Sequence, residues 1–331
     1  MNKKQTLIFI FLTSILQYAY SQNTKVLNEW QTVSTIDEVI ARHENGFVAV
    51  GDKFYVIGGR GIKPISIYDT KTNSWTTGKE SPIEIHHFQA VTYQGKIYVI
   101  GAMTGKYPYE KPLSKMLIYD PKLDTWEDGS EIPKNRRRGA CGVVVDAHKV
   151  YLVSGIIDGH NSGHVPWLDV YDFKNKSWSI LPDAPRARDH FHAVIGNRKI
   201  YVAGGRNSSF ATKQTFELTV PEIDVFDIKT TTWDTLDETY NLPTERAGTS
   251  TIFYKNQLLV IGGESVAMET AHNNVEAFDV KRNQWITLNY LKRGRHGTQA
   301  IRYKNAIYTV AGSGNRGGKP ELATMEKLTL D

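Results

Sequence analysis

Tryptophan recurs along this chain at nearly constant intervals. Six tryptophans are separated by 45, 51, 52, 55 and 52 residues, and five of them stand six residues after an aromatic-Asp pair such as Tyr68-Asp69. The six are Trp30, Trp75, Trp126, Trp178, Trp233 and Trp285. A repeat of about 50 residues is typical of a β-propeller whose repeats each form one four-stranded blade. The sequence therefore predicts an all-β, six-bladed β-propeller.

A second recurring feature is a β-branched or aromatic run that ends in small residues. The run is Phe54–Gly59 in the first repeat and Ile200–Gly205 in the fourth. Short apolar runs bounded by turn residues are typical of buried strands. The small-residue pair, the aromatic-Asp pair and the spaced Trp together resemble the kelch repeat over residues 29–330. The resemblance implies a kelch-type propeller, although repeats 2, 3 and 6 each lack one glycine of the pair.

The two ends of the repeat array are incomplete in complementary ways. The sixth repeat has no Trp of its own, and Trp30 stands alone ahead of the first repeat. We therefore expect an N-terminal strand near Trp30 to supply the outer strand of the last blade, which would close the ring and remove exposed sheet edges. Residues 22–331 then form a single propeller domain.

Residues 1–21 have the pattern of a secretory signal peptide. Two lysines precede the apolar run Leu7–Leu16, and Ala19–Ser21 fits the small-x-small cleavage pattern. The run is too short for a transmembrane span. We therefore expect a mature chain that begins near Gln22, is located in the periplasm or outside the cell, and does not insert into a membrane.

Charge and cysteine content narrow the possible partners. The formal net charge is +5, and eleven lysines recur in the tight turns of the repeat, where charge keeps sheet ends soluble. No basic run with interleaved aromatics is present, so we expect no nucleic-acid partner. The single cysteine, Cys141, cannot form an intramolecular disulfide and is expected to be a buried structural thiol in a monomer.

Loop lengths distinguish the two faces of the predicted disc. Alternate connections of a four-stranded meander emerge on opposite faces, and here the long ones follow the small-residue pair or the Trp. Long loops of the first kind span residues 103–115, 156–167, 206–222 and 264–273. Binding residues concentrate on loops held by a rigid scaffold, so this face is the predicted functional face. Of the ten histidines, only His148 falls on the other face.

Histidine and arginine both recur where the innermost strands begin. The histidines are His43, His86, His87, His190, His192 and His296. Five arginines share one aligned position: Arg42, Arg138, Arg188, Arg246 and Arg295. A single arginine at this position is well explained by hydrogen bonds to strand-end carbonyls. Six histidines at one rim indicate a site.

Arginine and histidine around a channel mouth suit an acidic sugar. A guanidinium matches a carboxylate bidentately, and an imidazole exchanges protons near neutral pH. An arginine bound to a uronate carboxylate would acidify the adjacent C–H, which favours β-elimination. The main hypothesis is therefore a dehydratase or lyase that acts on uronic-acid-containing oligosaccharides in polysaccharide degradation.

Specific roles follow from the alignment of the repeats. We predict His87 and His190 as the proton-transfer pair, because they occupy the same position in blades 2 and 4, with Tyr107 or Tyr240 as an alternative acid. Arg188 and Arg246 are the predicted carboxylate clamp. The other predicted substrate-binding residues are Arg42, Arg138, Arg295, His192, His296 and Trp167. His190 and His192 could ligate a metal, but the sequence favours a site without metal or cofactor.

The kelch resemblance leaves other functions open. Secreted kelch-type propellers include some that resemble sialic-acid mutarotases and some that act in polysaccharide breakdown. One alternative is therefore an acidic-sugar mutarotase or epimerase, and another is a non-catalytic propeller that binds a glycan or a protein. A copper site of the galactose-oxidase kind needs a Tyr-Cys crosslink, for which Cys141 has no evident partner.

Overall fold

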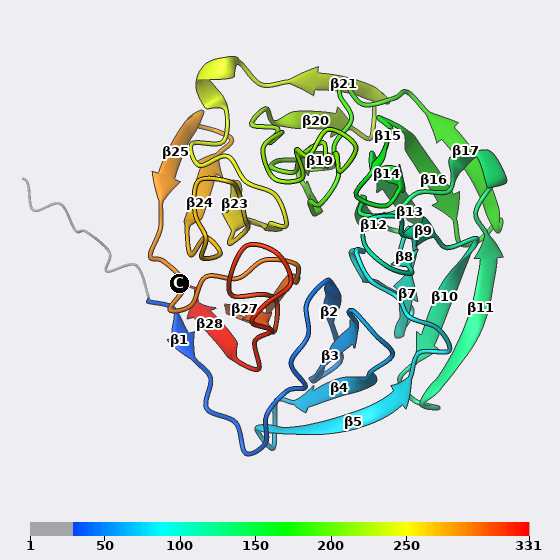
Figure 1. Cartoon of the computed structure of the whole chain (residues 1–331), viewed down its shortest axis with the longest axis vertical. Helices are drawn as coiled ribbons and strands as arrows, with labels where there is room; N and C mark the ends of the chain where they lie inside the picture. The colour runs from blue at the N-terminus through cyan, green and yellow to red at the C-terminus, as the bar shows by residue number, and fades with distance from the viewer. Residues whose placement is uncertain (1–28, 331) are drawn as a thin grey trace, which may run out of the picture.

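The computed structural model describes residues 29–330. Six four-stranded antiparallel sheets surround a central axis (Figure 1). This confirms the all-β, six-bladed kelch-type propeller. The predicted signal peptide lies outside the described residues and stays a prediction. No helix in the described part of the chain combines the length and apolarity of a membrane span.

The blades follow one another in sequence order, and each begins at the axis and ends at the rim. Blade 1 contains β2 (Asn45–Val50), β3 (Lys53–Gly58), β4 (Pro64–Asp69) and β5 (Ser74–Glu80). Blade 2 contains β6 (Val91–Tyr93), β7 (Lys96–Val99), β10 (Lys115–Asp120) and β11 (Thr125–Glu131). Blade 3 contains β12 (Gly142–Asp146), β13 (Lys149–Val153), β16 (Leu168–Asp172) and β17 (Ser177–Leu181).

The second half of the ring repeats this arrangement. Blade 4 contains β18 (Ala193–Gly196), β19 (Lys199–Val202), β20 (Asp224–Asp227) and β21 (Thr232–Thr235). Blade 5 contains β22 (Ser250–Tyr254), β23 (Gln257–Ile261), β24 (Val275–Asp279) and β25 (Gln284–Thr287). Blade 6 contains β26 (Ala300–Tyr303), β27 (Ala306–Val310), β28 (Met325–Thr329) and β1 (Gln31–Thr32).

Four short elements lie outside the six blade sheets. Two hairpins occupy the long loops of blades 2 and 3: β8 (Met103–Thr104) with β9 (Lys111–Pro112), and β14 (Ile156–Asp158) with β15 (Ser162–His164). Two short 3-10 helices span Lys134–Arg136 and Glu238–Tyr240.

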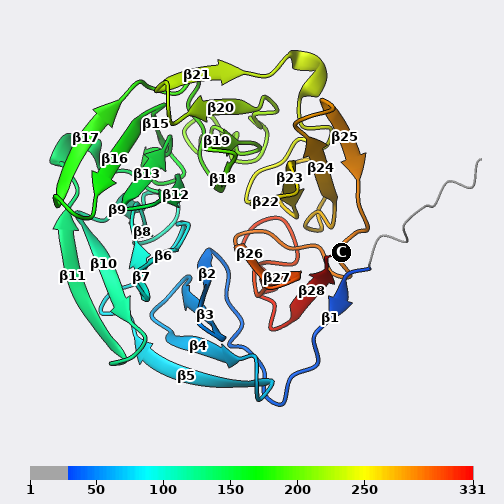
Figure 2. The same cartoon turned by 180° about the vertical axis from the view of Figure 1, so that it is seen from behind.

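The N-terminal strand closes the ring as expected. Gln31 pairs with Lys327 and Thr32 with Glu326, so β1 becomes the outer strand of blade 6. Both views show β1 beside β28 (Figures 1 and 2). Trp30 is fully buried in an apolar cluster shared by blades 5 and 6.

The repeated aromatic-Asp and Trp residues connect turns and neighbouring blades. In blade 1, Asp69 accepts hydrogen bonds from the backbone N–H groups of Lys71 and Thr72, which fixes the tight turn before β5. The Trp75 ring packs on Tyr68 with ring centroids 5.1 Å apart. In blades 2 to 5 the Trp Nε1 donates to a carbonyl of the preceding blade at 2.8–3.3 Å. The period of about 50 residues is therefore the period of blade-to-blade contact.

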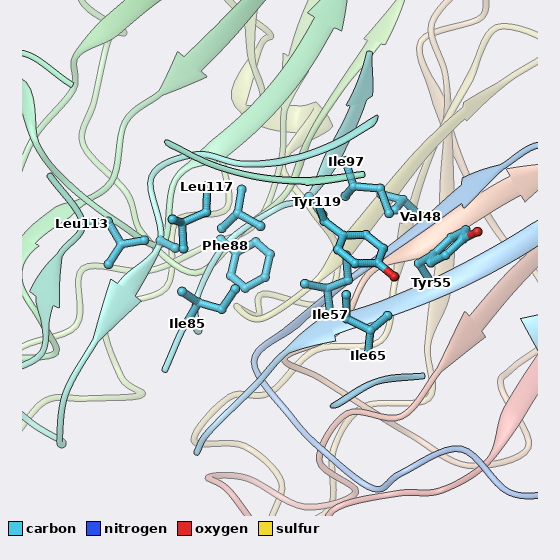
Figure 3. Close-up of a cluster of buried hydrophobic side chains, with 13 residues drawn as sticks. Val48, Tyr55, Ile57, Ile65, Ile85, Phe88, Ile97, Leu113, Leu117 and Tyr119 are labelled. Carbon is cyan, nitrogen blue, oxygen red and sulfur yellow. The ribbon is translucent and has the colours of Figure 1, made fainter. Parts of the chain in front are cut away.

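Apolar cores fill the spaces between blades. Figure 3 shows the cluster between blades 1 and 2, in which Ile57 and Phe88 are almost completely buried. Burial of each such side chain contributes about 1.5–3 kcal/mol. The small-residue pair permits this close approach, because a Cβ on Gly58 would lie only 2.5 Å from the Ile85 carbonyl oxygen of the next blade. The cores hold the inner strand ends at fixed positions around the axis.

Candidate functional site

Six residues, one from each blade, meet around the axis on the face with the long loops. Their backbones are left-handed, with φ between 51° and 64°. Each backbone N–H donates to the carbonyl of the residue from the preceding blade, and the six bonds of 2.5–3.2 Å form a closed ring. We call this set the axial ring: Glu44, His87, Ala140, His190, Gly248 and Gly297.

The axial ring concentrates backbone strain where side chains converge. A left-handed conformation costs a non-glycine residue about 1–2 kcal/mol, and four ring members are not glycine. Ala140 lies between His87 and His190 in the ring and contributes only a methyl group. The two imidazoles therefore approach each other, with ring centroids 4.8 Å apart. The structure thus brings together the two histidines that the repeat alignment paired.

A third imidazole joins them from the long loop of blade 3. The His160 ring centroid lies 4.9 Å from that of His87 and 4.6 Å from that of His190. All three side chains are buried. We call His87, His160 and His190 the histidine cluster.

Each member of the histidine cluster has a partner on its Nδ1 side. His160 Nδ1 lies 3.0 Å from a Glu110 carboxylate oxygen, and His87 Nδ1 lies 2.6 Å from His86 Nδ1. His190 Nδ1 makes a short hydrogen bond to the Asp189 carboxylate. His190 Nε2 is buried and has no hydrogen-bond partner. The Nδ1 partners fix the ring orientations.

Burial favours the neutral forms of His87 and His160. Desolvation, reinforced by the nearby His86 and His190, lowers the pKa of His87 well below its ordinary value. Desolvation also lowers the pKa of His160, although its hydrogen bond to Glu110 opposes this shift. Burial alone would raise the pKa of Asp189, but the adjacent His190 and a hydrogen bond from His164 hold it far below its usual range. Two neutral imidazoles, those of His87 and His160, are therefore combined with the ionised carboxylate of Asp189.

An open pocket of about 650 Å³ lies over the histidine cluster. This volume is within the range of small-ligand sites. His87 and His160 line the pocket, together with Tyr107, which is half exposed. Four cationic side chains contribute to the walls: Arg60, Lys106, Arg206 and Lys319.

The wall cations differ in their availability to a ligand. Arg60 pairs with Glu110 at 2.5 Å, and Arg206 pairs with Glu264 at 2.6 Å. Lys106 and Lys319 make no ion pair with any residue in the range 29–330. These two lysines are therefore the cations best placed to meet an anionic group.

The five aligned arginines are structural, which corrects the predicted carboxylate clamp. Arg188 donates to the carbonyls of Gly204 and Glu222 and to the Asp224 carboxylate, the last at 2.6 Å. All five are at most 2% exposed and none lines the pocket. The group comprises Arg42, Arg138, Arg188, Arg246 and Arg295. Their guanidiniums satisfy carbonyl groups at the strand ends, so they are not positioned to bind a substrate.

The remaining predicted residues divide between the pocket and the blade frame. His296 lines the pocket, but its Nε2 donates to the carbonyls of Asn315 and Gly317. His192 is mostly buried below the axial ring, and Trp167 stacks on Arg136 at 4.2 Å. Tyr240 packs against Phe278 near the rim. His192, Trp167 and Tyr240 do not line this pocket, and their roles at a ligand site stay predictions.

The family model described as Attractin/LZTR1 beta-propeller matches residues 12–272. The chain belongs to this family. It is similar to the kelch-like protein terF of Aspergillus terreus, with 26% identity over 324 residues that cover 92% of this chain and 68% of the relative. Kelch-like protein 40 of Xenopus laevis is 25% identical over 50% of this chain, but the match spans only 26% of that protein.

A solved structure supports the fold of this Attractin/LZTR1-type propeller. The structure described as YjhT superposes with a TM-score of 0.73 and covers 88% of this chain and 95% of its own. Its sequence identity is 14%, so the likeness concerns the fold alone. All these comparisons agree with the kelch-repeat propeller.

Sequence reasoning about this propeller missed the wall arginines and their acidic partners. A readable signal exists, because the residue after each small-residue pair lies at one aligned position. In blades 3 to 6 this residue forms a β-bridge to the residue that follows the buried arginine. In blade 2 it forms the bridge to His86, which is the corresponding residue there. The aligned residues are Arg60, Met103, Ile156, Arg206, Glu264 and Ser313. Arg60, Arg206 and Glu264 of this set line the pocket.

Proposed function

We propose that this propeller binds a uronic-acid-containing oligosaccharide in the central pocket and catalyses β-elimination on it. The observation that carries the proposal is the histidine cluster, a group of buried imidazoles of which His87 and His160 line an open pocket. The pocket walls carry four cationic side chains and the carboxylates of Glu44, Glu84 and Glu264. Neutral imidazole is the form that accepts a proton.

The pocket residues suit the parts of an elimination. Lys106 and Lys319 would pair with the sugar carboxylate and stabilise the negative charge that develops on it. His87, which lines the pocket, would accept the proton from the carbon next to the carboxylate. The C–H electron pair then forms the new double bond and the β C–O bond breaks. The hydroxyl of the half-exposed Tyr107, 3.3 Å from Thr215 Oγ1, would protonate the departing oxygen.

A second candidate is glycan binding without chemistry. Tyr107 lines the pocket and belongs to an aromatic group in which Tyr107 and Tyr109 each pack edge-on to Phe210, at centroid distances of 5.8 and 6.2 Å. All three are well exposed, and such surfaces stack on sugar rings. This candidate uses the same pocket and requires no proton transfer. An acidic-sugar mutarotase would also use it, and would exchange anomers without forming a double bond.

Ultraviolet absorbance on a panel of uronate oligosaccharides tests the proposal, because elimination creates a conjugated double bond. We expect absorbance to rise with time for the wild type. His87→Ala should lower the rate by about 10²–10⁴-fold, as removal of a general base does. His148→Ala, in a turn of the opposite face, is the control that keeps the wild-type rate. Binding without any absorbance gain would favour the second candidate.

A further inference from the structure

We infer that the histidine cluster is a binding site for a first-row divalent cation, with Zn²⁺ as the best match. One nitrogen from each of His87, His160 and His190 lies within 4.8 Å of the others. The three ring centroids form a nearly equilateral triangle with sides of 4.6–4.9 Å. Three imidazoles from separate blades or loops around one point are the ligand set of many zinc sites.

The hydrogen bonds leave three nitrogen lone pairs in the cluster. His160 and His190 each place Nδ1 against a carboxylate, which can only accept, so the ring proton is on Nδ1. Each Nε2 of the neutral ring therefore carries a lone pair. His190 Nε2 is buried and unpartnered, as expected for a ligand atom.

The same reasoning fixes the tautomer of His87. His86 Nε2 lies 3.0 Å from the Gly105 carbonyl oxygen and 3.4 Å from Arg60 Nη1; the shorter contact is to an acceptor, which favours the proton on Nε2 and the lone pair on Nδ1. His87 Nδ1, 2.6 Å from His86 Nδ1, must then be the donor. This leaves the lone pair of His87 on Nε2, which lies 3.4 Å from a Glu44 carboxylate oxygen. A lone pair beside a carboxylate is repulsive unless a cation lies between them.

The surroundings of the cluster match those of a metal site. Glu110 and Asp189 accept from the Nδ1 atoms of His160 and His190, which is the carboxylate–histidine arrangement that orients metal ligands. The strained axial ring holds His87, His190 and Glu44 in place. Two nitrogens bound at about 2.1 Å to one ion are at most about 4.2 Å apart, so small side-chain rotations would complete the site.

A cation at this site would take part in the proposed elimination, but cation binding can be tested without it. A cation held by the three imidazoles would keep an open position toward the pocket, where a uronate carboxylate could bind. In that state His87 would be a ligand, and the cation would supply a bound water of lowered pKa, about 7 for zinc, as the proton acceptor. Metal binding without substrate is therefore measured separately from elimination.

Metal binding is tested with Zn²⁺ alone on chelator-treated full-length protein. We expect one tightly bound Zn²⁺ per chain after dialysis, and a visible tetrahedral spectrum when Co²⁺ replaces it. His160→Ala should lose the Co²⁺ spectrum and weaken Zn²⁺ binding by more than 100-fold. His272→Ala is the matched control, because His272 is a buried histidine of the same face, bonded to Ser265 and outside the cluster.

Two milder variants keep the test decisive if His160→Ala fails to fold. Asp189→Asn and Glu110→Gln retain the ligands and should weaken Zn²⁺ binding by about 10–100-fold, as loss of an orienting carboxylate does. The inference is overturned if the wild type binds no Zn²⁺ at equimolar concentration. It is also overturned if the folded His160 variant keeps wild-type affinity and the Co²⁺ spectrum.

Discussion

At the scale of single residues, the molecule uses one side-chain type for two purposes. The aligned arginines are buried among carbonyls, whereas Arg60 and Arg206 reach the pocket walls from the position after the small-residue pair. Arg246 illustrates the first group, since it donates to the carbonyls of Gly262 and Val260 and pairs with Glu276 at 2.5 Å. Residue type and burial do not separate these roles, since Arg206 is only 1% exposed; the position in the repeat decides what a guanidinium contacts.

Replacing Arg246 should therefore destabilise the fold. Arg246→Ala leaves the buried Glu276 carboxylate without its cation, which typically costs about 3–5 kcal/mol. Urea unfolding followed by tryptophan fluorescence measures this loss. Lys106→Ala is the matched comparison, because Lys106 is exposed at the pocket. Its removal should change the free energy of unfolding by no more than about 0.5 kcal/mol, while weakening the binding of anionic ligands. An Arg246 variant of normal stability but weakened ligand binding would restore the clamp hypothesis.

At the scale of elements, the site depends on contact between long loops of neighbouring blades. The β14–β15 hairpin docks on the loop between β8 and β9 through a 2.8 Å hydrogen bond from His160 N–H to the Pro108 carbonyl. The loop of blade 4 joins through the Phe210 N–H, which donates to the His160 carbonyl at 2.8 Å. His160 therefore reaches the axis only because three loops are locked together.

Gly159 controls this docking. Its φ is +54°, and a Cβ there would lie 2.3 Å from a Glu110 carboxylate oxygen and 2.4 Å from the Pro108 carbonyl oxygen. Gly159→Ala should push the hairpin outward, displace His160 and lower turnover by about 10²-fold, since small misplacements of reacting groups have that effect. Gly163→Ala in the same hairpin also has a left-handed φ but no contact with the β8–β9 loop, so it should retain turnover. Equal loss in both variants would contradict the docking argument.

The elements also show what could be predicted from sequence. Blade number, ring closure at Trp30 and the proximity of His87 to His190 could be predicted from the repeat, because each depends on aligned positions. His160 lies in a loop unique to blade 3, and its position depends on tertiary contacts with two other loops that no repeat encodes. The position of Tyr240 outside the pocket could not be predicted either, since the connection after β21 runs along the rim.

At the scale of the whole molecule, the pairing of β1 with β28 closes the ring within blade 6, and contacts between blades 6 and 1 add to it. The backbone of Glu44 bonds to Gly297 within the axial ring, and Tyr303 donates to Asp52 at 2.5 Å on the opposite face. On the pocket face, Glu321 of blade 6 pairs with Lys63 at 2.9 Å and with His43 at 2.8 Å. The junction between these two blades is thus tied at the axis and on both faces.

The Glu321 tie makes closure sensitive to acid. Partial burial alone would raise the pKa of Glu321, but hydrogen bonds from His43 and Lys63 lower it from its usual 4.5 to about 2. The unfolded chain therefore binds this proton at a higher pH than the folded chain, so stability is present above about pH 4.5 and is lost as the pH falls toward 2. Allowing for the partial exposure of both side chains, the loss is about 1–3 kcal/mol.

Melting temperatures of the wild type and of Glu321→Gln across this pH range test the prediction. The variant should melt lower at pH 7, and the difference should shrink as the pH falls from 4.5 toward 2, because protonation removes the same charge from the wild type. Glu38→Gln, at an exposed position that takes no part in the ion pairs of the junction, should follow the wild type throughout. A difference between wild type and Glu321→Gln that stays constant with pH would mean that the shape of the side chain, and not its charge, holds blades 6 and 1 together.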